Sequence, residues 1–191
     1  MSVSAVVLAG GRSSRFGRDK LAEPLDGATV LWRTIEAVRG ISDDIVVVVG
    51  PDGLATEPPD VRIVRDGEAH GGPLIGALTG LAACTHGTVV LAGGDMPWLD
   101  ARVLGLMVAS CTPEMDGVAL GFDGRRQQLP LALHRDAALL AATRLVENGE
   151  RRLGALLEAL ALIVIPEVEW RRLDPAAATI RDIDTPDDLA I

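Results

Sequence analysis

Four basic residues lie within nine positions near the start of this 191-residue chain. They follow a short apolar run and two glycines, Gly10 and Gly11, and are Arg12, Arg15, Arg18 and Lys20. Paired glycines let backbone N–H groups approach a polyphosphate without a Cβ in the way, and such amide nests bind anions. The chain as a whole carries a net charge of −9. Positive charge gathered in one loop of an acidic protein therefore indicates a site for a nucleoside triphosphate.

Lys20 is the only lysine among the eighteen lysine and arginine residues. With this bias, a position that needs only surface charge would ordinarily hold arginine. A compact ammonium on a slender stem differs from the planar arginine fork in how it meets phosphate. We therefore expect Lys20 to contact the triphosphate; the alternative is a lysine retained by chance.

The spacing of this loop excludes two familiar phosphate-binding motifs. A Walker loop needs Gly-Lys-Ser/Thr, whereas Gly17 is followed by Arg18 and Asp19. A dinucleotide fingerprint needs GxGxxG, which Gly10, Gly11 and Gly17 do not supply. The loop is suited to phosphate without being either motif.

Apolar runs alternate along the chain with segments of helical periodicity. Strands are expected at 3–8, 45–49, 61–64, 88–91, 118–120, 129–133 and 162–165. Helices are expected at 30–38, 74–83, 100–109, 136–147 and 152–160, with a last one beginning at 185–186. This order predicts a single domain, 1–191, with a three-layer α/β/α Rossmann-like fold and a mostly parallel sheet. Pro130 has no N–H to donate to a neighbouring strand. Its strand is therefore expected either to lie at a sheet edge or to begin after the proline.

In such a sheet, ligands bind outside the carboxyl ends of the strands, which selects the loops after Leu8, Leu91 and Val64. Asp95 follows the strand at 88–91, so its carboxylate should project into the same cleft as Lys20. Mg²⁺ takes oxygen ligands and often joins one or two carboxylates to substrate phosphates. Asp95 is therefore the candidate metal ligand; the alternative is an Asx-turn cap.

Composition excludes several other classes of function. The acidic balance argues against non-specific binding to nucleic acid. The apolar runs are too short for a membrane span, and no basic leader is evident at the start. Cys84 and Cys111 lie far apart without a CxxC motif, as suits a reduced protein. We expect a cytoplasmic protein without nucleic-acid or membrane partners.

Several short motifs resemble, in order, those of the molybdenum cofactor guanylyltransferases, within the Rossmann-like nucleotidyltransferases. The resemblance covers nearly the whole chain. It is carried by Leu-Ala-Gly-Gly at 8–11, Ser-Arg-Phe-Gly at 14–17, Asp-Lys at 19–20, Gly-Gly-Pro-Leu-Ile-Gly at 71–76, Gly-Asp-Met-Pro at 94–97 and Asp-Thr-Pro at 184–186.

The resemblance implies transfer of GMP from GTP to molybdopterin or the molybdenum cofactor, with Mg²⁺ as cofactor and release of pyrophosphate. It also implies transient contact with cofactor-delivery proteins. Lys20, Arg15 and Asp95 would be catalytic, and Asp95 would hold the metal. The nucleotide would contact residues mainly within the first hundred positions, and the acceptor those within 101–191. The implied nucleotide-binding residues are Leu8, Ala9, Gly10, Gly11, Lys20, Asp66, Gly76 and Asp95.

One departure from the family leaves alternatives open. Asp182 and Asp184 stand where these guanylyltransferases often carry Asn and their cytidylyl relatives carry Asp. A CTP:molybdopterin cytidylyltransferase, or a relative with another phosphorylated acceptor, is therefore the nearest alternative. The Leu8-Ala9 start and the Gly-Pro-Leu segment favour guanine. A nucleotide-binding regulatory module without turnover is the other alternative, against which Lys20 and Asp95 argue together.

Overall fold

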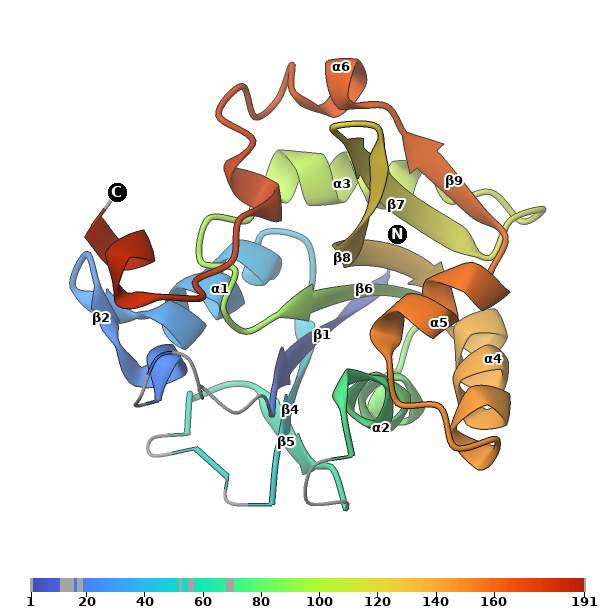
Figure 1. Cartoon of the computed structure of the whole chain (residues 1–191), viewed down its shortest axis with the longest axis horizontal. Helices are drawn as coiled ribbons and strands as arrows, with labels where there is room; N and C mark the ends of the chain where they lie inside the picture. Colours follow the sequence, from blue (N-terminus) through green and yellow to red (C-terminus); the bar gives the residue numbers. More distant parts are fainter. Residues whose placement is uncertain are drawn as a thin grey trace.

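The computed structural model describes residues 2–10, 16, 19–51, 53–54, 57–67 and 71–190. Within these residues the central sheet has seven strands, in the order β5-β4-β1-β6-β8-β7-β9 (Figure 1). Its strands are β1 (Val3–Ala9), β4 (Asp44–Val49), β5 (Arg62–Arg65), β6 (Thr88–Gly93), β7 (Gly117–Phe122), β8 (Arg125–His134) and β9 (Leu162–Ile165). A separate small hairpin, which the sequence patterns did not predict, pairs β2 (Pro24–Leu25) with β3 (Ala28–Thr29).

The predicted mixed fold with a mostly parallel sheet is confirmed. β4 pairs in parallel with β5 and β1, β1 pairs in parallel with β6, and β7 pairs in parallel with β9. Only β8, among the described strands of this sheet, runs against its neighbours. The carboxyl ends of β1, β4, β5 and β6 consequently lie along one edge.

The prediction for the strand that contains Pro130 was wrong. β8 includes the proline and lies between β6 and β7 rather than at an edge. The ladder with β6 stops at Leu131, and the register with β7 shifts between Ala119 and Gly121, so neither ladder includes Pro130. A proline is tolerated inside a sheet at such an irregularity, because no ladder hydrogen bond is required of its nitrogen there.

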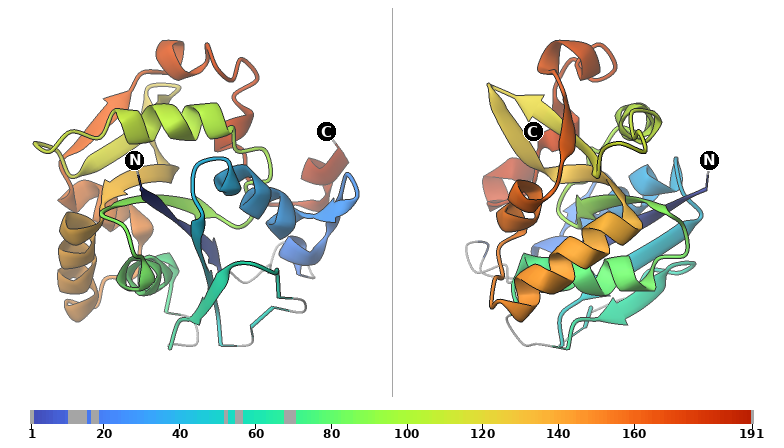
Figure 2. Two further views of the ribbon diagram at one scale, coloured as in Figure 1. Left: turned by 180° about the vertical axis from the view of Figure 1, so that it is seen from behind. Right: turned by 90° about the vertical axis from the view of Figure 1, so that its right-hand side faces the viewer.

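Helices cover both faces of the sheet (Figure 2). One face packs against α1 (Val30–Arg39) and α3 (Ala101–Ala109), and the other against α2 (Pro73–Ala83), α4 (Arg135–Glu147) and α5 (Leu153–Ala159). The remaining helical turns are η1 (Lys20–Ala22), α6 (Glu167–Trp170), η2 (Ala178–Ile180) and η3 (Pro186–Ala190). The last of these is the helix expected after Thr185.

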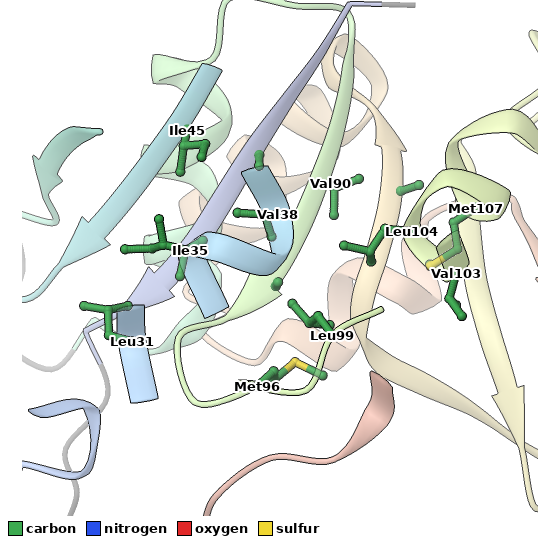
Figure 3. Packing of buried hydrophobic residues seen from close by; sticks show 14 of the residues in the cluster. Leu31, Ile35, Val38, Ile45, Val90, Met96, Leu99, Val103, Leu104 and Met107 are labelled. Carbon is green, nitrogen blue, oxygen red and sulfur yellow. The ribbon is translucent and has the colours of Figure 1, made fainter. Parts of the chain in front are cut away.

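The alternation of side chains along the strands divides the apolar core into two clusters. Val47 and Val90 point to one face, while their neighbours Val46 and Val89 point to the other. Figure 3 shows the first cluster, in which Ile35 of α1 packs beside the strands. Because both faces are covered, the strands read as continuous apolar runs.

None of the helices in the described part of the chain combines the length and hydropathy needed to cross a bilayer.

Candidate functional site

The turn after β6 is fixed to the end of β1. The N–H of Gly94 donates to the carbonyl of Leu8 at 2.9 Å. A Cβ at Gly94 would lie 3.1 Å from that oxygen, so a larger residue would push the two segments apart. The turn that carries Asp95 is thereby held against the strand that leads into the basic loop.

The ends of β1, β4 and β5 also approach closely. A Cβ at Gly10 would lie 3.1 Å from the nitrogen of Gly50 and 3.4 Å from Oδ2 of Asp66. Asp66 is only 9 % exposed, and its N–H donates to the carbonyl of Val49 at 3.0 Å. The sheet therefore brings the Asp66 carboxylate beside Gly10, although the two are far apart in the sequence.

Lys20 begins the short helix η1 and meets Asp95 across this edge. Asp19 caps η1 by accepting from the N–H of Leu21 at 3.0 Å, and Leu21 is buried in the core. The ammonium of Lys20 lies 2.6 Å from Oδ2 of Asp95, and the side chains are 14 % and 24 % exposed. The expected meeting of these two side chains is thus present in the structure.

The C-terminal segment completes the surroundings of the ammonium. Nζ of Lys20 donates to the carbonyl of Ile183 at 2.6 Å and lies 3.5 Å from Oδ1 of Asp184. Burial lowers the pKa of Lys20, but the hydrogen bonds and charges of Asp95 and Asp184 outweigh burial, and the net pKa is raised. The lysine is therefore an ammonium at neutral pH.

Three carboxylates gather around this lysine. One oxygen from each of Asp95, Asp182 and Asp184 lies within 4.8 Å of the others. Burial, followed by the charges of Asp95 and Asp184, raises the pKa of Asp182. Three carboxylates beside one ammonium leave an excess of negative charge, and their hard oxygen donors match the ligands that Mg²⁺ takes in proteins.

The structure describes some of the remaining predicted site residues and not others. Leu8 and Ala9 are the last residues of β1. Gly76 is buried in α2, where a Cβ would lie 3.4 Å from Cδ2 of Leu8, so its visible role is helix–sheet packing. Gly11 and Arg15, like Arg12 and Arg18, lie outside the described residues.

The roles of Asp182 and Asp184 stayed open from sequence patterns alone, and Ile183 was not among the predicted site residues. The Asp-x-Asp spacing before a helix start was the available signal for the two acids. Ile183 contributes its backbone carbonyl, which no side-chain pattern reveals.

A separate pocket of about 390 Å³ adjoins η1. Its walls include Asp19, Leu21, Trp32, Leu54 and Pro58, and its lining contains no lysine or arginine among the described residues. A mainly apolar pocket with acidic members is poorly suited to a triphosphate.

Comparisons with known proteins show which families and folds the chain resembles. The family model of the MobA-like NTP transferase domain matches residues 5–163. A Chloroflexus aggregans protein named "Probable molybdenum cofactor guanylyltransferase" is 32% identical, covering 100% of this chain and 93% of the relative. A Mycobacterium avium protein of the same name is 34% identical over 87% of each chain.

Solved structures share the fold at lower sequence identity. Molybdopterin-guanine dinucleotide biosynthesis protein A from Archaeoglobus fulgidus superposes with a TM-score of 0.78 at 22% identity, covering 98% of this chain and 95% of that one. The 2-C-methyl-D-erythritol 4-phosphate cytidylyltransferase from Thermus thermophilus gives a TM-score of 0.70 at 17% identity, covering 100% and 96%.

Proposed function

Since the chain belongs to the MobA-like nucleotidyltransferase family, we propose that it transfers GMP from GTP to a molybdopterin-type molybdenum cofactor. The observation that carries this proposal is the meeting of the Lys20 ammonium with the Asp95 carboxylate at the carboxyl edge of the sheet. The names of the two relatives support guanine and the acceptor.

In this reaction an oxygen of the acceptor phosphate attacks the α-phosphorus of GTP. A new P–O bond forms as the bond to the bridging oxygen of the β-phosphate breaks, and pyrophosphate leaves with that electron pair. Such transfers depend on positioning and charge neutralisation more than on covalent help from the protein. Lys20 supplies a fixed positive charge for the α-phosphoryl group and the leaving group.

The carboxylates of Asp95, Asp182 and Asp184 fit a divalent cation, because all three offer oxygen ligands within one small region. Bound there, Mg²⁺ would neutralise phosphate charge as a Lewis acid. With the carboxylates engaged in this way, the ammonium of Lys20 would exchange its contact with Asp95 for contacts with the phosphates.

The base would bind near Asp66. A carboxylate can accept from both the N1–H and the 2-amino group of guanine, and Asp66 lies beside Gly10 where the loop toward the triphosphate begins. Base and phosphates would then lie along the same edge of the sheet.

A transfer assay tests the proposal. The purified protein is incubated with Mg²⁺, molybdopterin and GTP, and pyrophosphate and the guanylylated product are measured. Lys20→Ala should lower turnover by roughly 100-fold or more, by analogy with removal of a transition-state donor. Lys20→Arg, which keeps the charge but changes its shape, should restore little of it.

Arg171→Ala is the matched control, because Arg171 pairs with Glu167 in the segment around α6, outside the candidate site. It should retain wild-type turnover. Unimpaired transfer by Lys20→Ala would overturn the assignment of the site.

A second candidate keeps the fold and chemistry but uses CTP. Its support is that Asp182 and Asp184 are acids, as in the cytidylyl relatives. Running the same assay with CTP separates the two candidates, because only the preferred nucleotide should give efficient product formation. Nucleotide binding without turnover of any triphosphate would instead indicate a regulatory module.

A further inference from the structure

We propose that the C-terminal segment 181–188, here called the strap, is a positioning element that holds Lys20 in place through the backbone of Ile183. This inference rests on the proposed role of Lys20 in transfer and adds Ile183, which no motif singled out. Figure 1 shows the C-terminal segment beside the hairpin formed by β2 and β3. The hydrogen bond from Nζ of Lys20 to the carbonyl of Ile183 joins this segment to η1, which is distant in the sequence.

Ile183 contacts both partners of the central ion pair through its backbone. Its N–H donates to the carbonyl of Asp95 at 2.9 Å, and its carbonyl accepts from Nζ of Lys20 at 2.6 Å. One residue of the strap thus connects the turn after β6 with the lysine of η1. These three segments are separated by 75 or more residues in the sequence, so their relative placement depends on such contacts.

The strap is anchored on both sides of that carbonyl. The side chain of Ile183 is fully buried in the first core cluster. Before it, the guanidinium of Arg181 lies 4.7 Å from the centre of the Trp98 ring. Because the side chain of Ile183 is buried and Arg181 stacks on Trp98, the carbonyl of Ile183 has little freedom to move.

After Ile183, the side chain of Asp188 closes the strap into a turn. Its Oδ2 accepts from the N–H of Asp184 at 3.0 Å and from the N–H and hydroxyl of Thr185 at 2.7 Å and 2.9 Å. These bonds fix the backbone of the residue that follows the carbonyl.

The Ile183 carbonyl differs from the neighbouring carboxylates in carrying no charge. Because it is neutral, it neither repels phosphate nor attracts Mg²⁺ as the carboxylates do, so it can retain the ammonium when Asp95 binds a cation. The strap would therefore fix the direction of Lys20 throughout the reaction. Loss of that direction should affect turnover more than nucleotide binding, since misplacement of a reacting group by about 1 Å can cost on the order of 100-fold.

The unique lysine permits a direct test. In a tag-free protein with ¹³C-labelled lysine, the single side-chain ε-carbon signal belongs to Lys20, and its relaxation reports the mobility of the ammonium. Ile183→Ala should make the Lys20 side chain more mobile, as seen in the relaxation of this signal. It should also lower kcat by about 10- to 100-fold, while KM for GTP changes less than about threefold. Ile183→Val, which keeps a buried β-branched side chain, should recover both properties.

Ile165→Ala is the matched control, because Ile165 is equally apolar and buried but belongs to β9. It should cost similar stability and leave Lys20 ordered with kcat near wild type. Should Ile183→Ala not fold, Asp188→Ala opens the turn at the surface and should produce the same effects more weakly.

An ordered Lys20 and wild-type kcat in folded Ile183→Ala or Asp188→Ala would overturn the proposal, as would an equal loss of kcat in Ile165→Ala. The relaxation measurement also separates this inference from the function. If the wild type transfers no nucleotide but Ile183→Ala still frees Lys20, the reaction assignment fails and the positioning contact stands.

Discussion

The candidate site depends on two residues of opposite charge that come from distant loops. Lys20 and Asp95 approach to 2.6 Å, and both side chains are largely buried. Burial of a lysine disfavours its charged form unless nearby groups compensate for the lost solvation. Asp95 and Asp184 provide this compensation, which explains why the pKa of Lys20 is raised despite burial.

Asp95→Asn should weaken both partnerships of this carboxylate. An amide offers an uncharged oxygen to Mg²⁺ and no counter-charge to Lys20, so transfer should fall by about 100-fold. The Mg²⁺ concentration for half-maximal rate should rise, and excess Mg²⁺ should restore activity only in part. Initial rates over a Mg²⁺ titration provide the measurement. Asp136→Asn, on an almost fully exposed side chain of α4, should not alter the Mg²⁺ dependence. An unchanged titration in Asp95→Asn would remove Asp95 as a metal ligand.

Among the secondary-structure elements, α2 packs closely against the sheet. A Cβ at Gly80 would lie 2.4 Å from Cγ1 of Val6 and 3.0 Å from Cγ2 of Val48. Val6 and Val48 are buried and β-branched, so they cannot turn away easily. The absence of a side chain at Gly80 therefore sets how closely α2, with Gly76 near its start, lies against β1 and β4.

Gly80→Ala should consequently destabilise the fold by about 1–3 kcal/mol, through overpacking. Gly105→Ala is the matched control, because Gly105 is also inside a helix but has no atom within 4 Å of a Cβ. It should stabilise by about 0.5–1 kcal/mol through helix propensity alone. Urea denaturation of both variants measures the difference. Equal effects at the two positions would contradict the packing explanation.

A polar cluster around Asp44 joins strands at the opposite edge of the sheet. Asp44 accepts from the hydroxyl of Ser4, the guanidinium of Arg62 and the N–H of Thr85. Burial raises the pKa of Asp44, but these donors outweigh it and lower the pKa to about 2. The carboxylate therefore connects β1, β4, β5 and the segment before β6 while it is ionised.

A folded-state pKa below the unfolded value of about 4 means that this stabilisation is complete above pH 4–5 and is lost as pH falls toward 2. Asp44→Asn should thus lower the free energy of unfolding at pH 7 by about 1–2 kcal/mol. The difference from wild type should shrink at pH 3. Chemical denaturation at both pH values provides the test, and a difference that stays constant with pH would exclude ionised Asp44 as the cause.

In the complete fold, the candidate nucleotide contacts are distributed over the carboxyl ends of several strands. A ligand that joins these loops binds the folded chain only, so it should raise the melting temperature. GTP with Mg²⁺ should raise it by several degrees, and by more than CTP or UTP at the same concentration. A free nucleotide concentration 100-fold above Kd increases the free energy of unfolding by about 2.7 kcal/mol. A larger shift with CTP would transfer the function to the cytidylyl alternative.

Much of this architecture could be predicted from local sequence patterns. Apolar runs and helical spacing indicate strands and helices because each depends on neighbouring residues, and the rule that sites lie at strand ends selected Lys20 and Asp95. Pro130 misled the prediction because its place in the sheet depends on a register shift against β7, which is a property of the pairing.

The chemistry available in the sequence and its assembly in space thus have different origins. Residue types alone identify an ammonium, carboxylates and glycines suited to phosphate, since these properties belong to single side chains. The approach of Asp182, Ile183 and Asp184 to Lys20 results from burial of Ile183 and from the path of the chain back to the sheet edge. A backbone carbonyl is the same in every residue, and only folding gives the carbonyl of Ile183 a specific partner.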